Sequence, residues 1–175
     1  MKFKFFFGLL SLLIISCTQK SKNEATYAKQ DITEIPSPIK QSPIDTSKIA
    51  VIEFDQTGNW PFDNSCKPIS LSKNELIVID SLLHICANNY NKQLEEIVKK
   101  SYKIDFKNYN YKLQYVAVVN NKGEKEVWIN GFCDPLDHNW KKEIIHVKDG
   151  GNCFFNLKIN LSTKSCSNIS VNGYT

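Results

Sequence analysis

The sequence predicts an α+β fold in which one long amphipathic helix packs on a four- to five-stranded antiparallel meander sheet. Two patterns carry this prediction. Apolar residues recur at helical spacing between Leu76 and Cys86, and after Asp105 the period changes to the alternation of apolar and polar residues that is typical of strands. A sheet with one apolar face must cover that face, and the single helix is the available cover.

The helix is expected over residues 73–88. Ser72 and Glu75 match a capping box, in which the serine hydroxyl and the glutamate satisfy the first free amides of a helix. The apolar positions that follow form one buried face, namely Leu76, Ile79, Leu82, Leu83 and Cys86. Residues 93–100 either continue this helix or form a second short one with a solvated, charged face.

A β-hairpin is the clearest structural prediction. Residues 111–119 and 127–133 both alternate, and between them Gly123 can take a positive φ in a turn at no steric cost. The remaining strands are expected at residues 49–54, 142–147, 153–161 and 169–172.

The order of a strand, a long helix and consecutive antiparallel strands resembles the cystatin-like class of α+β folds. The resemblance concerns topology, and such folds have many functions. Cystatins present Gln-x-Val-x-Gly on a hairpin, whereas residues 114–118 lack the glycine and lie within a strand pattern. Protease inhibition by a cystatin-like wedge is therefore disfavoured.

The N-terminus reads as an export signal over residues 1–16. Lys2 and Lys4 precede an apolar run that is too short for a bilayer, which needs about 20 residues. Residues 14–17, Ile-Ile-Ser-Cys, resemble the lipobox of bacterial lipoproteins, which implies lipid attachment at Cys17. Two or more acyl chains anchor a protein stably to a membrane. The alternative is an ordinary secretory signal cut elsewhere.

The rest of the chain divides into a tether and one domain. Residues 17–48 are rich in Ser, Thr, Lys and Gln, with few large apolar side chains, which predicts a flexible tether. Residues 49–175 have the length of a single α+β domain. Thr18 follows the cysteine and no acidic cluster comes after it, which favours an outer-membrane lipoprotein facing the periplasm over one on the cell surface.

Charge excludes one class of partner. All 22 basic residues are lysine, and loss of Lys2 and Lys4 with the signal lowers the formal charge from +4 to +2. A nucleic-acid-binding protein would need a clustered basic face, usually with arginine. We expect no nucleic acid as partner; the expected partners are the membrane, through the lipid anchor, and another envelope protein or glycan.

Five cysteines remain beside Cys17. An odd number in an oxidising compartment predicts two disulfides and one free or intermolecular thiol, although five buried thiols are the alternative. Cys133 and Cys153 share the core face of their strands and could bridge, unless a strand at 142–147 intervenes. Cys66 and Cys86 could tie the loop before the helix to the helix, which contributes about 3 kcal/mol. Cys166 has no assigned partner.

The sequence predicts no catalytic residues, cofactor or metal site. A thiol-dependent hydrolase using Cys133 with His138 is one alternative, because a cysteine nucleophile needs a histidine base within reach. An inhibitor or immunity-type protein is a second alternative function. No Cys-x-x-Cys or His-x-x-x-His pair exists, and residues 149–152 lack the oxygen ligands of a calcium loop.

Two stretches carry a family resemblance. Residues 115–130 and 149–155 resemble a family of small uncharacterised lipoproteins and secreted proteins of Bacteroidota. The resemblance covers the C-terminal half and implies export and a similar fold, but no activity or site residues. Together these features predict a membrane-anchored bacterial envelope lipoprotein with a small, non-catalytic binding domain.

Overall fold

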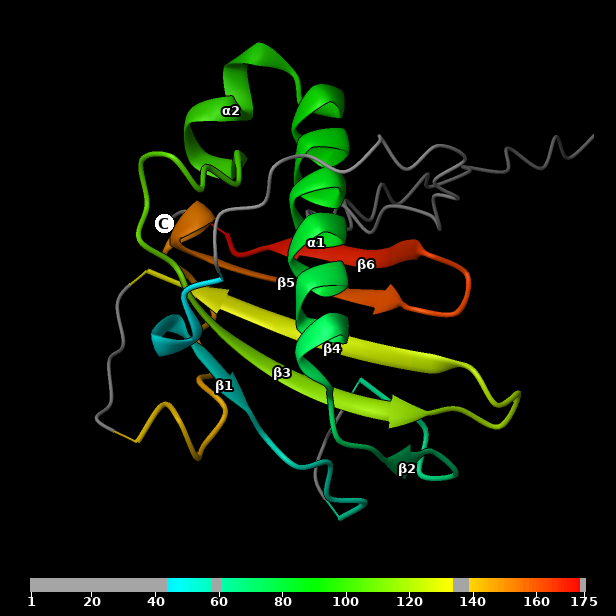
Figure 1. Ribbon diagram of the computed structural model, residues 1–175. Coiled ribbons are helices and arrows are strands. Elements are labelled where there is room, and N and C mark those ends of the chain that lie inside the picture. The colour runs from blue at the N-terminus through cyan, green and yellow to red at the C-terminus, as the bar shows by residue number, and fades with distance from the viewer. Residues whose placement is uncertain (1–43, 58–60, 134–138, 174–175) are drawn as a thin grey trace, which may run out of the picture.

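A computed structural model describes residues 44–57, 61–133 and 139–173. It contains one mixed sheet and two α-helices, which confirms the α+β class (Figure 1). In chain order the elements are η1 (Thr46–Lys48), β1 (Ile49–Val51), β2 (Lys67–Pro68), α1 (Lys73–Gln93), α2 (Glu96–Tyr102), β3 (Lys112–Val119), β4 (Lys125–Phe132), η2 (Gly151–Cys153), β5 (Phe154–Asn160) and β6 (Ser165–Val171). Neither helix in these ranges is long and apolar enough to cross a membrane.

Several predictions fall outside these residues. The signal over 1–16, the lipid attachment at Cys17 and the tether as far as residue 43 are not described, and neither is His138. The last part of the predicted tether is described, and it forms the single turn of η1 with Asp45 as its cap.

The predicted hairpin is present. Strands β3 and β4 pair antiparallel with Tyr115 opposite Ile129. In the turn, the Asn120 side chain accepts hydrogen bonds from the amides of Lys122 and Glu124, each at 3.0 Å, and Gly123 has a φ of 78°. Strands β5 and β6 follow in chain order, each antiparallel to its neighbour.

The sheet is mixed, so the prediction of a wholly antiparallel meander was wrong at one edge. The strand order is β1-β3-β4-β5-β6, with β1 parallel to β3 and β2 antiparallel to the far half of the same β3 edge. The chain between β1 and β3 contains both helices. A long helical crossover of this kind is what allows neighbouring strands to run parallel.

The strand predicted at residues 142–147 does not form. The side chain of Gln114 in β3 forms hydrogen bonds with the backbone of this segment instead. Its amide nitrogen donates to the carbonyls of Trp140 (2.5 Å) and Glu143 (2.6 Å), and its oxygen accepts from the Ile145 amide (3.0 Å). Asn130 of β4 donates to the Ile145 carbonyl at 2.8 Å. Because side chains take the place of a partner strand, β5 lies directly beside β4.

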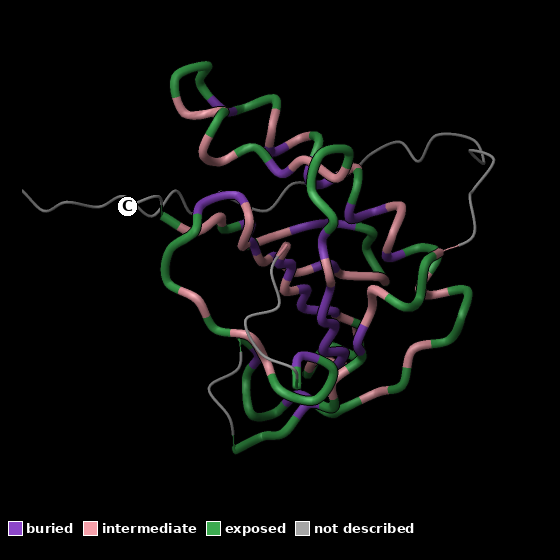
Figure 2. Tube along the Cα trace, turned by 90° about the vertical axis from the view of Figure 1, so that its left-hand side faces the viewer, coloured by how far each residue is buried: buried purple, intermediate pink, exposed green. Residues whose placement is uncertain are grey.

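The sheet is covered on both faces. Helix α1 buries residues including Ile79, Leu83 and Cys86 against one face of β3 to β6. On the opposite face, Phe54, Phe62 and Cys66 pack on β3 and β4, and Trp140 packs on Phe132. Figure 2 shows the buried residues concentrated through the middle of the domain. Strand β3 is therefore buried on both sides.

The predicted capping box begins α1. The Ser72 hydroxyl accepts from the Glu75 amide at 3.3 Å, and the Glu75 carboxylate accepts from the Ser72 amide at 2.8 Å. Lys125 of β4 donates to the other Glu75 oxygen. The hydrogen bond from Lys125, followed by those from Ser72, lowers the pKa of Glu75 from 4.5 to about 2. This carboxylate thus fastens the helix start to the sheet.

Replacing Glu75 should make stability depend less on pH. A carboxyl with a lowered folded-state pKa stabilises the fold above its unfolded pKa and loses that effect as the pH falls through the folded value. We expect Glu75→Gln to lower the free energy of unfolding by roughly 1 kcal/mol at neutral pH. The difference from wild type should vanish between pH 4.5 and about 2. Urea unfolding at several pH values measures it.

Glu95→Gln is the matched control, because Glu95 stands at the N-cap of α2 but makes no capping hydrogen bond with its side chain. Its unfolding free energy should stay within about 0.5 kcal/mol of wild type throughout. An equal effect of both substitutions would contradict the specific role of Glu75.

Candidate functional site

Two disulfides hold the domain. One joins Cys133, after β4, to Cys153, before β5, with the Cα atoms 5.1 Å apart, which confirms one predicted pairing. It forms because no strand intervenes. The other joins Cys86 of α1 to Cys166 of β6, with the Cα atoms 6.2 Å apart. Both Cα separations lie in the range of protein disulfides.

The predicted pairing of Cys66 with Cys86 was wrong. Cys66 is buried on the sheet face opposite α1, among Val116, Val118 and Trp128, whereas Cys86 lies in the core on the α1 face. The sheet itself separates the two sulfurs. Cys66 is free and buried, and burial raises the pKa of its thiol.

The disulfides bear on the thiol-hydrolase alternative. A cysteine nucleophile acts as the thiolate. Cys133, the candidate nucleophile, has its sulfur in a disulfide, and His138 lies outside the described residues. The chemistry predicted for Cys133 with His138 would first require reduction of the bond to Cys153.

A hollow opens between α1, the start of β1 and the segment before β3; we call it the α1–β1 hollow. Its volume is about 210 Å³. Three groups of side chains line it: charged residues from the segment 45–48, a carboxylate and an imidazole from α1, and aromatic rings from residues 106–111. They include Asp45, Lys48, Asp80, His84, Phe106, Tyr109 and Tyr111.

Each acidic side chain in this hollow lies beside a basic one. Lys48 lies 3.5 Å from the Asp45 carboxylate, and the Asp80 carboxylate lies 3.8 Å from Nδ1 of His84. The hydrogen bond from the Ser47 hydroxyl is the main cause of a lowered pKa of Asp45. Because each carboxylate already has a basic neighbour, the hollow suits an uncharged polar ligand better than a cation.

Aromatic rings form the apolar part of the hollow. The His84 ring lies 4.5 Å from the Phe106 ring, which contacts Tyr111 edge-on at 5.3 Å between centroids. Tyr109 is partly exposed and lies 5.7 Å from Tyr111. Such rings bury much area and leave polar tips available for hydrogen bonds. A run of aromatic and polar residues at 106–111 was the signal of this site in the sequence, and we did not predict it.

A second, more open hollow of about 420 Å³ lies beside the first, and Tyr109 lines both. Its other lining residues are Lys99, Lys100, Lys103, Asp105, Asn108 and Asn152. Acidic and basic side chains are thus paired in the first hollow, whereas lysines predominate in the second.

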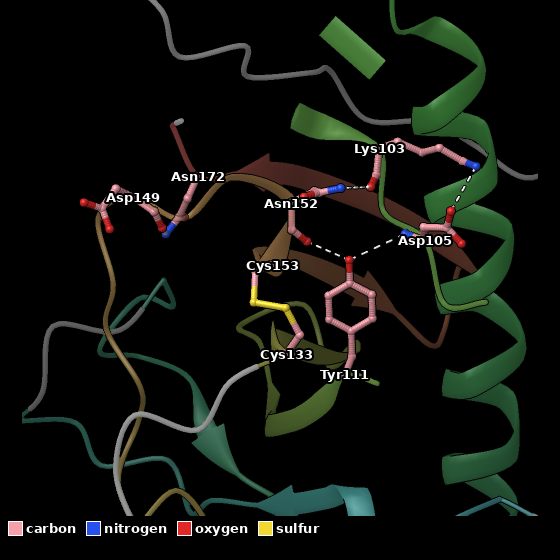
Figure 3. The surroundings of a disulfide bond; sticks show 8 residues. All are labelled: Lys103, Asp105, Tyr111, Cys133, Asp149, Asn152, Cys153 and Asn172. Carbon is pink, nitrogen blue, oxygen red and sulfur yellow. Dashed lines mark hydrogen bonds and ion pairs between the residues drawn. A yellow bond between two sulfur atoms is a disulfide. The ribbon is translucent and has the colours of Figure 1, made fainter. Parts of the chain in front are cut away.

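A network of hydrogen bonds positions residues 103–111, which contribute to the lining of both hollows (Figure 3). The Tyr111 hydroxyl donates to the Asn152 carbonyl at 2.6 Å, and the Asn152 side chain donates to the Lys103 carbonyl at 2.9 Å. Burial raises the pKa of Tyr111 to about 12, so that the hydroxyl keeps its proton and remains a donor. Asn152 adjoins Cys153, and the disulfide to Cys133 thus supports this network.

Asn91 of α1 also binds residues 103–111, through hydrogen bonds with the backbone of Ile104. Its side chain donates to the Ile104 carbonyl at 2.7 Å and accepts from the Ile104 amide at 2.9 Å. Asp105, next along the chain, accepts from Asn108, and this bond is the main cause of its lowered pKa. Local polar contacts therefore fix the loop that lines both hollows.

Two features of the described residues bear on possible chemistry. Among these residues no group of three His, Cys, Asp or Glu side chains could hold a metal ion. In the same ranges the Tyr115 hydroxyl is a buried side-chain polar atom without a hydrogen-bond partner, but burial raises its pKa strongly, so it is no base at neutral pH. No protein-family model, curated protein or solved structure matches the chain.

The cysteine assignment can be tested by thiol labelling and peptide mapping. The unreduced domain should yield the linked pairs Cys86–Cys166 and Cys133–Cys153. Cys66 should react slowly when folded, because it is buried and its thiol pKa is raised, and quickly in urea. A linked Cys66–Cys86 peptide, or equal labelling of Cys66 in both states, would contradict the structure.

Proposed function

We propose that this protein is a membrane-anchored bacterial envelope lipoprotein whose small domain binds another envelope component and catalyses no reaction. The observation that carries the proposal is the lipobox-like Ile-Ile-Ser-Cys at residues 14–17. Two disulfides in the domain support it, because disulfides persist in oxidising compartments such as the periplasm.

The location and the family belong to the same proposal. The domain faces the periplasm from the outer membrane, and its relatives are the lipoproteins and secreted proteins of Bacteroidota that residues 115–130 and 149–155 resemble. A cystatin-like topology with a long amphipathic helix is the proposed finer fold. The order of α1 followed by the antiparallel strands β3 to β6 supports it, and the parallel β1 departs from it.

The α1–β1 hollow is the proposed binding site. It combines aromatic surface from Phe106 and Tyr109 with polar groups from Asp80 and His84, and each of its carboxylates lies beside a basic side chain. Ligand sites typically combine an apolar lining with a few polar groups that fix orientation. Such a lining fits an uncharged polar partner, a glycan or a polar loop of an envelope protein. An inhibitor or immunity protein would use the site in the same way, on a protein partner.

The lipid anchor is tested by metabolic labelling with a clickable fatty acid. Wild-type protein should be labelled and recovered with membranes, whereas Cys17→Ser should lose the label and appear in the soluble fraction, because the thiol is the acylation site. Cys66→Ser is the matched control and should stay labelled. Undiminished labelling of Cys17→Ser would overturn the proposed anchor.

The binding site is tested by photo-crosslinking in cells. A photoreactive phenylalanine analogue at Tyr109 should give an adduct of discrete mass, because Tyr109 lines the hollow and is partly exposed. The same analogue at Lys122, in the β3–β4 turn, should not. Protease or glycosidase treatment of the adduct distinguishes a protein from a glycan. Identical patterns from both positions would contradict a site at the hollow.

A further inference from the structure

Helix α2 carries an apolar side chain that the fold does not use. Ile97 is 85% exposed, far more than any other large hydrophobic side chain in the described ranges. A single exposed apolar residue is ordinary by itself. Ile97 is notable because lysines flank it along the chain.

The chain from residue 92 to residue 107 is the basic part of this end of the domain. It contains five lysines and three acidic residues: Lys92, Lys99, Lys100, Lys103 and Lys107 with Glu95, Glu96 and Asp105. Glu96 pairs with Lys99, and Asp105 pairs with Lys103. Within the described chain no carboxylate lies within 4 Å of the amines of Lys92, Lys100 or Lys107. Three exposed cations are thus left to face another surface.

This surface lies at the end of the domain where the proposed tether enters. Tyr109 lines the hollow that contains Ile44 and Asp45, the first described residues, and also the hollow that contains Lys99, Lys100 and Lys103. Figure 1 shows α2 beside one end of α1, and α2 contacts η2, which precedes β5. An anchor upstream of Ile44 would therefore leave this end of the domain within reach of the membrane.

We propose that α2 and its flanking lysines, from Lys92 to Lys107, form a surface that rests on the anionic headgroups of a bilayer. The lysine amines would contact lipid phosphates, and the Ile97 side chain would enter the boundary with the acyl chains. Lysines near an anionic membrane each strengthen binding by about fivefold. A soluble polyanion would use the lysines but not the isoleucine, which favours a lipid surface.

Because the proposed tether keeps the domain near the membrane, even a weak contact between α2 and the lipid would be occupied. Residues 18–43 separate Cys17 from Ile44, and a coil of that length has an end-to-end distance of roughly 28 Å. Tethering converts binding to an intramolecular event with an effective concentration of about a millimolar. This inference rests on the proposed function for its tether, whereas the surface of α2 is independent of it.

Vesicle co-sedimentation tests the contact without the anchor. The probe is the mature chain with Cys17→Ser, mixed with phosphatidylethanolamine vesicles that contain or lack phosphatidylglycerol. We expect binding only to the anionic vesicles, and weaker binding as salt rises, because exposed charges are screened. The double variant Lys100→Glu with Lys107→Glu should bind at least tenfold more weakly, and Ile97→Asp several-fold more weakly.

Two matched variants control for charge and for apolar exposure. Lys122→Glu alters an exposed lysine in the β3–β4 turn, and Val78→Asp alters a side chain of α1 that is 39% exposed. Both should bind as the parent does, and circular dichroism should show every variant folded. Equal binding to vesicles without anionic lipid, or equal loss in the controls, would overturn the proposal. Fatty-acid labelling of Cys17 is a separate measurement, so the anchor can stand if the α2 contact fails.

Discussion

The burial of β3 on both faces is the constraint to which the rest of the domain conforms. Helix α1 covers one face, and the segments around Phe54, Phe62 and Trp140 cover the other. Gln114 is fully buried on that second face, where an unpaired amide would cost about 1–3 kcal/mol. Its bonds to the 140–145 segment satisfy the amide and hold the loop in place of a strand.

The covered sheet explains how the cysteines pair. Two cysteines can bond only on one side of the sheet, so Cys86 reaches Cys166 of β6, and Cys66 remains alone on the other side. The second disulfide closes the β4–β5 junction beside Asn152. From there Asn152 and Tyr111 connect to the segment that lines the two hollows. The rigidity of the candidate site thus derives from the same core.

Both proposed contacts lie at one end of the molecule. Tyr109 lines both the α1–β1 hollow, which Ile44 also lines, and the hollow that Lys99, Lys100 and Lys103 line. If the domain rests on headgroups through α2, the hollow lies close to the membrane surface. The hollow would then bind its partner, a polar glycan or a protein segment, close to the bilayer. The lipid anchor and the α2 surface would act together, because membrane binding through either one raises the probability of binding through the other.

The sequence by itself determined the local features. The Ser72–Glu75 cap, the β3–β4 hairpin with Gly123 and the α+β class depend on neighbouring residues and on period, which are legible in a single chain. The face alternation of Cys133 and Cys153 also indicated their bond.

Only the tertiary structure decided the rest, because it depends on contacts between residues distant in sequence. The path of the chain across the sheet decides three features that the sequence left open. These are the parallel direction of β1, the side of the sheet on which Cys66 lies, and the absence of a strand at residues 142–147. The α1–β1 hollow is of the same kind, since it brings together residues from the segment 44–49, from α1 and from the segment before β3. Periodicity reports which residues are buried, but not which segments bury them.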